Sequence, residues 1–233
     1  EMLQVPLKLI LEAKGRIGVL DMLSNMREYD DSTFNHCLNV ALICNVFASW
    51  LKLDEKQIEM ATACGLFHDI GKLLIPKEIV TKPGALTDLE YAEIKRHPEA
   101  GYRLLLDNNV DKRICNAALM HHERCDGQGY PSRLHMPQID FYARHIAIID
   151  AYEAMTSPRS YRQSLTPLEV VERFEASGMM QYDYEILRPI MIRIADTQLG
   201  MTVKLNDDSV WEIFLPNSMK CLVCMCFCRV STD

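Results

Sequence analysis

The sequence predicts an all-α fold that ends in a small β hairpin. Apolar residues recur three and four positions apart from about Leu7 to Ile194, which is the spacing of residues along one face of an α-helix. From Met201 the pattern changes to short apolar stretches on either side of an Asn-Asp-Asp-Ser turn. We therefore expect a helical bundle followed by a hairpin over residues 201–216.

The helices can be placed in order from their capping signals and from the turn residues between them. A first helix within residues 1–30 leads into the domain, and its apolar positions include Leu9, Ile17 and Leu20. Capping boxes predict helix starts at about residues 55, 88 and 167, from the pairs Asp54 with Gln57, Thr87 with Glu90, and Thr166 with Glu169. Further helices are expected near residues 33–52, 98–107, 111–122, 140–156 and 182–198.

Residues 217–233 form a tail of their own, rich in cysteine. Its cysteines could hold zinc or an iron–sulfur cluster, but structural zinc usually joins two pairs separated by a loop of about a dozen residues or more. We therefore favour a hydrophobic tail or strand over a metal site for Cys221, Cys224, Cys226 and Cys228. The cysteines in apolar, helix-like segments are expected to be reduced core residues: Cys37, Cys44, Cys64 and Cys115.

Composition limits the class of protein. The chain of 233 residues is 48% hydrophobic and 24% charged, which is typical of a globular domain and excludes a disordered or collagen-like chain. A formal charge of −7 argues against binding to a nucleic acid polymer, so a phosphate-bearing ligand would need local cations or metals. No apolar run reaches the roughly 18 residues of a membrane span, and no signal peptide is evident, so we expect a cytoplasmic protein without a membrane segment.

Five histidines and two aspartates stand out because imidazole and carboxylate groups bind metals. They are His36, His68, Asp69, His97, His121, His122 and Asp150. This donor set suits Fe, Mn, Zn, Ni or Co better than Mg or Ca. A lone histidine in an apolar helix is usually a core residue, so the group predicts the site and no single member does. Seven ligands are enough for two metal ions that share one carboxylate.

Asp69 is the expected bridge between the two ions. Adjacent residues on a helix point about 100° apart, so His68 and Asp69 can face different metals. Lys72 follows Asp69 by three residues, and its ammonium is expected at the same site, where it would hold a phosphate oxygen.

The segment HHERCDGQGYP at residues 121–131 follows one of the expected helices. Its glycines, Gly127 and Gly129, let the backbone approach a ligand closely. Glu123 and Asp126 are expected either to orient histidine N–H groups or to cap the turn, and both alternatives stay open.

Five motifs occur in order between residues 31 and 200: HDIGK at 68–72, KPGALT at 82–87, KRHPEAGY at 95–102, HHERCDGQGYP at 121–131 and IDAYEAMTSPRSYR at 149–162. Together they resemble the HD-GYP family, a subgroup of the HD phosphohydrolases that hydrolyses cyclic dinucleotides, chiefly cyclic di-GMP. The resemblance implies an HD-type helical bundle, with an HD-GYP catalytic domain over residues 31–200.

The resemblance also implies a ligand set for two divalent metal ions, with iron or manganese favoured. His36, His68, Asp69 and Asp150 would surround one ion, and Asp69, His97, His121 and His122 would surround the other. Ser32 stands four residues before His36, at the position where some members carry a Glu that binds a third metal, so two ions are expected. His135 and His145 lie outside the family pattern and are not expected in the site.

Substrate contacts are implied by the same motifs. Lys72 resembles the lysine that contacts the scissile phosphate and, with Asp69, is the expected catalytic residue. Arg159 and Arg162 match the basic positions of the R-P-Y-R segment that would hold phosphates, with a solvated helix end as the alternative. Tyr130 and Glu153, the latter in place of the usual second Asp of D-x-Y-D-A, are expected at the substrate edge.

The activity implied is hydrolysis of cyclic di-GMP to linear pGpG, with onward cleavage to GMP left open, by metal-activated hydroxide attack on phosphorus. A phosphodiesterase for mixed cyclic GMP-AMP and a catalytically inactive cyclic-dinucleotide sensor are the alternatives. Because the chain starts at Glu1, we expect an excised domain that follows an upstream sensor or receiver domain. A diguanylate cyclase that docks on the turn Gly129-Tyr130-Pro131, here called the GYP turn, is a further expected partner.

Overall fold

The protein is a helical bundle with a small antiparallel sheet at its C-terminal end. The computed structural model describes residues 16–158, 163–176, 180–204, 209–214 and 226–229. Its elements are α2 (Arg16–Tyr29), α3 (Asp31–Trp50), α4 (Glu55–Phe67), η1 (Ile70–Leu74), α5 (Lys77–Val80), α6 (Asp88–Ile94), α7 (His97–Asp107), α8 (Lys112–Met120), η2 (Met136–Gln138), α9 (Phe141–Thr156), α10 (Pro167–Ala176), α11 (Tyr184–Asp196), β1 (Thr202–Lys204), β2 (Val210–Phe214) and β3 (Cys226–Arg229). The predicted fold class is confirmed. Among the described helices, none is both long and apolar enough to cross a lipid bilayer.

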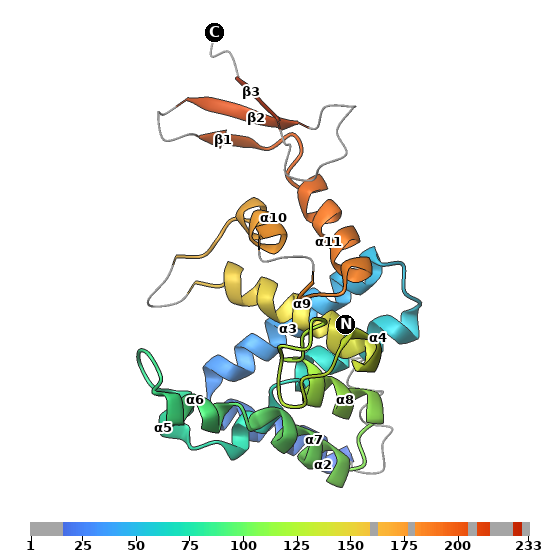
Figure 1. The fold of residues 1–233 in the computed structure, drawn as a ribbon, viewed down its shortest axis with the longest axis vertical. Helices are drawn as coiled ribbons and strands as arrows, with labels where there is room; N and C mark the ends of the chain where they lie inside the picture. The colour runs from blue at the N-terminus through green and yellow to red at the C-terminus, as the bar shows by residue number, and fades with distance from the viewer. Residues whose placement is uncertain (1–15, 159–162, 177–179, 205–208, 215–225, 230–233) are drawn as a thin grey trace.

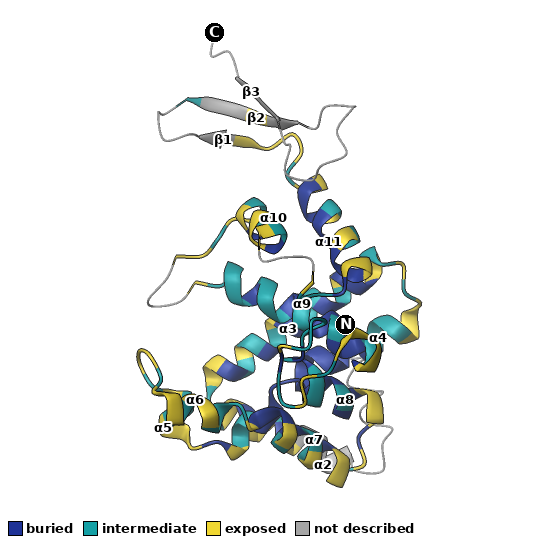
Figure 2. Ribbon diagram, viewed as in Figure 1, coloured by how far each residue is buried: buried dark blue, intermediate teal, exposed yellow. Residues whose placement is uncertain are grey.

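The centre of the bundle is formed by α3, which packs against α2, α4, α9 and α11. Buried residues concentrate in these central helices, whereas α5 is largely exposed (Figure 2). Because apolar side chains are removed from water on several faces of α3 and α4, these two helices fix the positions of the shorter ones around them. The core cysteines are confirmed as buried free thiols: Cys37, Cys44, Cys64 and Cys115.

Helix boundaries follow the local capping signals closely. The three predicted capping boxes are present, with reciprocal bonds between side chain and backbone in the pairs Asp54 with Gln57, Thr87 with Glu90, and Thr166 with Glu169. The prediction that His68 and Asp69 lie within a helix is wrong. α4 ends at Phe67 with His68 as its C-cap, and the chain turns into η1, where the Lys72 amide donates to the Asp69 carbonyl at 2.9 Å.

The predicted hairpin is present and gains a third strand. β1 and β2 pair antiparallel with Val203 opposite Trp211, and β2 also pairs with β3, where Ile213 lies opposite Phe227. The sheet lies beyond the end of α11, away from the central helices (Figure 1). Cys226 and Cys228 belong to β3, whereas Cys221 and Cys224 lie outside the described residues, so the choice between strand and metal site for the whole tail stays a prediction.

His145, on α9, is a buried histidine away from the expected site residues. It is 0% exposed, and neither ring nitrogen has a hydrogen-bond partner in the described structure. Burial lowers its pKa from 6.5 to about 4. The unfolded chain therefore binds a proton between these two pH values that the folded protein does not bind, and acidification through this range destabilises the fold.

We expect His145→Leu to reduce this acid sensitivity. At pH 5 the unfolded chain binds a proton at residue 145 that the folded wild-type protein does not bind, which lowers the unfolding free energy by about 2 kcal/mol relative to neutral pH. The leucine variant has no group to protonate there and should not show this decrease. Urea unfolding of both chelator-treated proteins at pH 7.5 and pH 5 measures the difference. An identical drop in both proteins would show that His145 does not contribute to acid sensitivity.

Candidate metal centre

Three histidines are presented at helix ends with their ring orientation fixed by the backbone. His68 and His121 are the C-cap residues of α4 and α8, and His97 is the first residue of α7. In each, Nδ1 lies 2.6 to 2.9 Å from the carbonyl oxygen three residues earlier. Because a carbonyl oxygen only accepts, Nδ1 carries the proton and donates it, and Nε2 is left with a free lone pair.

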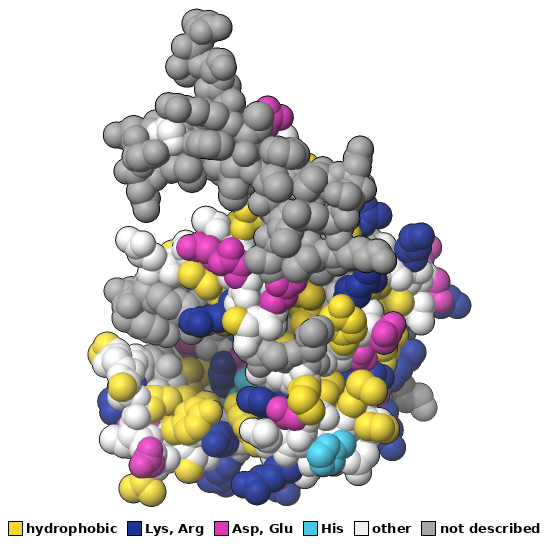
Figure 3. Space-filling view, turned by 45° about the horizontal axis from the view of Figure 1, so that its top comes forward, with side chains coloured by type: hydrophobic (Ala, Val, Ile, Leu, Met, Phe, Trp, Pro, Cys, Tyr) yellow, Lys and Arg dark blue, Asp and Glu magenta, His cyan; other side chains and the backbone are white. Residues whose placement is uncertain are grey.

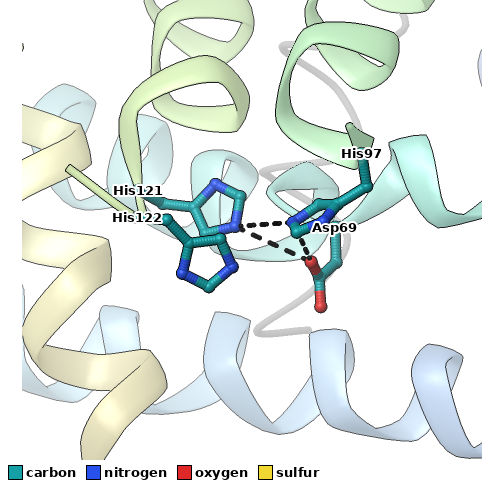
Figure 4. A group of neighbouring side chains, drawn as sticks. All are labelled: Asp69, His97, His121 and His122. Carbon is teal, nitrogen blue, oxygen red and sulfur yellow. Dashed lines mark hydrogen bonds and ion pairs between the residues drawn. The ribbon is translucent and has the colours of Figure 1, made fainter. Parts of the chain in front are cut away.

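These lone pairs converge on Asp69 instead of on hydrogen-bond donors. The His97 Nε2 lies 3.1 Å from Asp69 Oδ1 and 3.2 Å from the His121 Nε2 (Figure 4). Two unprotonated nitrogens and a carboxylate oxygen cannot satisfy one another, and both the His68 Nε2 and the Asp69 Oδ1 are buried without a hydrogen-bond partner among the described residues. Such a set of acceptors without a donor fits a bound cation.

The two oxygens of Asp69 face two different groups of ligands. One group is Asp69, His97, His121 and His122, and the other is His36, His68 and Asp69, with the ligand atoms of each group within 4.8 Å of one another. Oδ1 faces the first group, whereas Oδ2 lies 3.6 Å from the His36 Nε2 and 3.5 Å from the His68 Nε2. Asp69 is therefore placed to bridge two cations.

Lys72 and Asp150 lie at the edge of these groups. The Lys72 Nζ lies 2.5 Å from Asp69 Oδ2, so the ammonium is at the site as the spacing predicted. Asp150 Oδ1 lies 3.1 Å from the His36 Nε2, beside the group that contains His36. The structure thus brings together all seven metal-type residues that the sequence singled out.

Burial keeps most of these imidazoles in the form that binds metal. It lowers the pKa of His68 to about 4, lowers that of His97, and lowers that of His122 well below its usual value. The pKa of Asp69 is well below its usual range because Lys72 and His68 outweigh its burial. Neutral imidazoles around a charged carboxylate are what a divalent cation requires. For His36, hydrogen bonds to Asp150 and Glu153 outweigh burial and raise the pKa to about 9.

Glu153 was expected at the substrate edge, but in the structure its carboxylate is hydrogen-bonded to neighbouring side chains. The residue is buried, and its Oε2 lies 2.7 Å from the His36 Nδ1. Its Oε1 accepts from Asn39 Nδ2 at 3.1 Å and from Ser157 Oγ at 2.7 Å. With both oxygens engaged, Glu153 fixes the ring of His36 and turns its Nε2 towards Asp150. Asn39 and Ser157 were missed because nothing in the sequence distinguishes them.

We expect Glu153→Gln to weaken metal binding about 10- to 100-fold, because carboxylates that hydrogen-bond to ligand histidines typically contribute this much. Chelator competition measures the affinity, and circular dichroism should stay unchanged. Glu172→Gln, on the exposed side of α10, is the matched control. Equal affinity in both variants would mean that Glu153 does not position His36.

The turn after α8 packs back on its own chain. A Cβ on Gly129 would lie 2.4 Å from the Arg124 nitrogen, so the close approach is to residues 122–124, and no contact with a ligand is needed to explain it. The Glu123 carboxylate accepts from two amides of this turn, those of Ser132 and Leu134, and so caps it. The ring of Tyr130 stacks on that of His122, with centroids 4.7 Å apart.

The other residues considered from the sequence lie outside the two ligand groups or outside the described residues. Arg159 and Arg162 lie outside the described residues. Asp126 pairs with Arg124 and accepts from the Gln128 amide, which makes it a turn cap. His135 and His145 belong to neither ligand group.

Known proteins resemble this chain in sequence and in fold. The family model described as HD domain matches residues 20–186. The chain is 35% identical, over 79% of its own length and 44% of the relative's, to a cyclic di-GMP phosphodiesterase of Pseudomonas aeruginosa. It is 41% identical, over 60% of its own length and 32% of the relative's, to 3'3'-cGAMP-specific phosphodiesterase 1 of Vibrio cholerae. The chain thus spans less than half the length of these relatives.

Two solved structures share the fold. The HD domain of the phosphodiesterase PgpH of L. monocytogenes superimposes with a TM-score of 0.56 at 20% identity, over 76% of this chain and 96% of that one. An HDG"Y"P protein of Bdellovibrio bacteriovorus superimposes with a TM-score of 0.56 at 18% identity, over 67% of this chain and 50% of that one.

A helical bundle whose helix ends gather histidines around one buried aspartate defines the class of HD-type helical domains. The family match covers most of the chain, and the protein therefore belongs to the HD domain family. The resemblance to the HD-GYP subgroup, drawn from the motifs, is confirmed by the cyclic dinucleotide phosphodiesterases among its relatives.

Proposed function

We propose that this domain is a metal-dependent phosphodiesterase that hydrolyses cyclic di-GMP to linear pGpG, with GMP as a further product if pGpG is cleaved in turn. The observation that carries the proposal is the convergence of five histidines, one from within α3 and four from the ends of α4, α7 and α8, on the two oxygens of Asp69. Two metal-type groups that share a carboxylate match the arrangement of two-metal hydrolases, in which both the attacking and the leaving oxygens of a phosphate are stabilised.

The two groups, with Asp150 beside His36, support a ligand set for each ion. His36, His68, Asp69 and Asp150 would hold one ion, and Asp69, His97, His121 and His122 the other. The mixed nitrogen and oxygen donors favour a first-row transition metal, with iron or manganese as our first choices. Bound there, such ions would supply Lewis acidity and neutralise charge on the phosphoryl oxygens.

The other residues would bind and orient the substrate. Lys72 stays protonated, because Asp69 outweighs burial and raises the pKa of its ammonium, and it would donate to a phosphate oxygen of the reacting group. Glu153 would keep the ring of His36 in place during turnover, as its hydrogen bond indicates. Arg159 and Arg162, in the matching positions of the substrate segment, remain proposed phosphate contacts.

A second candidate is hydrolysis of mixed cyclic GMP-AMP, which the 41% identity to a cGAMP-specific enzyme supports. An inactive sensor is a weaker alternative, because a protein that only binds has no need of two ligand groups that share a carboxylate. An upstream sensor or receiver domain, and a diguanylate cyclase at the GYP turn, remain proposed partners.

The test combines metal analysis with product analysis. Anaerobically purified protein is assayed for bound metals, and cyclic di-GMP and cyclic GMP-AMP are each supplied while products are separated by chromatography. We expect two first-row metal ions per chain and pGpG from cyclic di-GMP. Full metal content with bound but uncleaved dinucleotide would make the protein a sensor, and faster turnover of cyclic GMP-AMP would favour the second candidate.

A further inference from the structure

Lys95 places a positive charge close to the candidate metal centre. It is the C-cap residue of α6 and stands two residues before His97. Its Nζ lies 4.3 Å from the ring centroid of Tyr91 and 5.3 Å from that of Tyr130. Tyr130 also stacks on His122, so the ammonium and a member of one ligand group contact the same aromatic ring.

The charge of Lys95 is not neutralised by an acid. Nearby cations are paired with carboxylates: Lys72 with Asp69, Lys82 with Glu90, and Arg96 with Glu93. Within the part of the chain that the structure describes, no such ion pair involves Lys95. Aromatic faces attract an ammonium without cancelling its charge, so Tyr91 and Tyr130 hold Lys95 in place and leave it able to bind an anion.

The second phosphate of a cyclic dinucleotide requires a positive charge such as that of Lys95. The dinucleotide carries two phosphates, and only one of them can occupy the metal groups beside Lys72. The other phosphate loses part of its hydration in the site, which is costly without a compensating charge. The protein carries a formal charge of −7, so this compensation must come from a local cation. In the face shown in Figure 3, a histidine side chain lies deep in a hollow with lysine or arginine side chains beside it.

We propose that Lys95, held between Tyr91 and Tyr130, binds the phosphate of the cyclic dinucleotide that is not being hydrolysed. This assignment rests on the proposed function and adds a contact that selects substrates with two phosphates over simple diesters. Tyr130, which contacts both Lys95 and His122, then holds the ammonium at a fixed place beside the metal groups.

Lys95→Met tests the proposal, with Arg96→Met as the matched control, since Arg96 is adjacent but exposed and paired with Glu93. We expect Lys95→Met to raise the KM for cyclic di-GMP about tenfold or more, the effect of losing one charge-assisted hydrogen bond. Metal content and hydrolysis of bis(p-nitrophenyl) phosphate, which has a single phosphate, should not change. Lys95→Arg should restore most of the affinity, and Arg96→Met should behave as wild type.

Salt provides a second readout. The gap in KM between wild type and Lys95→Met should narrow at 1 M NaCl, where the screening length is about 3 Å. An undiminished gap would indicate a contact that is not ionic, and an unchanged KM at low salt would remove Lys95 from the substrate site. If Lys95→Met lost both its bound metal and its hydrolysis of bis(p-nitrophenyl) phosphate, Lys95 would have a structural role instead. A wild-type protein that cleaves the small diester but neither binds nor cleaves cyclic di-GMP would overturn the proposed function itself.

Discussion

Asp69→Ala should abolish cyclic di-GMP hydrolysis and remove bound metal from both ligand groups. Each oxygen of Asp69 faces a different group, and among the described residues Asp69 is the one member that the two groups share. The expected fall in kcat is on the order of a thousandfold or more, because metal ions contribute several kcal/mol to stabilising the transition state. Elemental analysis and product chromatography on the same preparation measure both effects.

The fold should survive this substitution. Asp69 lies in the turn between α4 and η1 and caps no helix through its side chain, so circular dichroism should remain helical. Asp196→Ala, at the exposed end of α11, is the control and should retain full metal and activity. Turnover that persists in Asp69→Ala after the metal is lost would be incompatible with a two-metal mechanism.

Gly71→Ala should have the largest effect on stability. A Cβ at this position would lie 1.9 Å from the carbonyl oxygen of His97 and 2.5 Å from the nitrogen of Gly101, both in the backbone of α7. Backbone cannot move aside as a flexible side chain can, so η1 and α7 must separate. We expect a loss of about 3 kcal/mol or more in unfolding free energy, measured by urea denaturation.

The matching substitution on the other side of this contact is Gly101→Ala. Its Cβ would lie no closer than 3.1 Å to any neighbouring atom, the nearest being the Gly71 nitrogen, so a small adjustment accommodates it. The stability of this variant should lie between those of wild type and Gly71→Ala. Equal stability of Gly71→Ala and wild type would mean that η1 and α7 can separate at little cost.

Features that depend on residues close in sequence could be predicted. A capping box joins a side chain to an amide three residues away, so Asp54 with Gln57 and Thr87 with Glu90 were readable without knowledge of the fold. The metal-type residues were equally readable, because histidine and aspartate in these motifs have few structural explanations. Their grouping in space then follows from the ends of α4, α7 and α8.

Features that depend on distant contacts could not be predicted. Glu153 and His36 are 117 residues apart, and only the packing of α9 on α3 brings them together. From the sequence alone, Glu153 was close only to Asp150, so it was assigned to the substrate edge and not to His36. The end of α4 at Phe67 was missed for a related reason, since η1 is set by its packing against α7 and no Pro or Gly lies between Phe67 and Asp69.

The bonds from histidine Nδ1 to backbone carbonyls have a consequence for metal exchange. They orient the rings of His68, His97 and His121 from within their own helix ends, without help from a cation. In a zinc finger the ligands are organised by the ion, and the chain unfolds when the ion leaves. Here folding alone already orients the candidate ligands, so we expect that one ion could be replaced by another without refolding. The metal content of the protein would then follow the supply of iron and manganese in its surroundings.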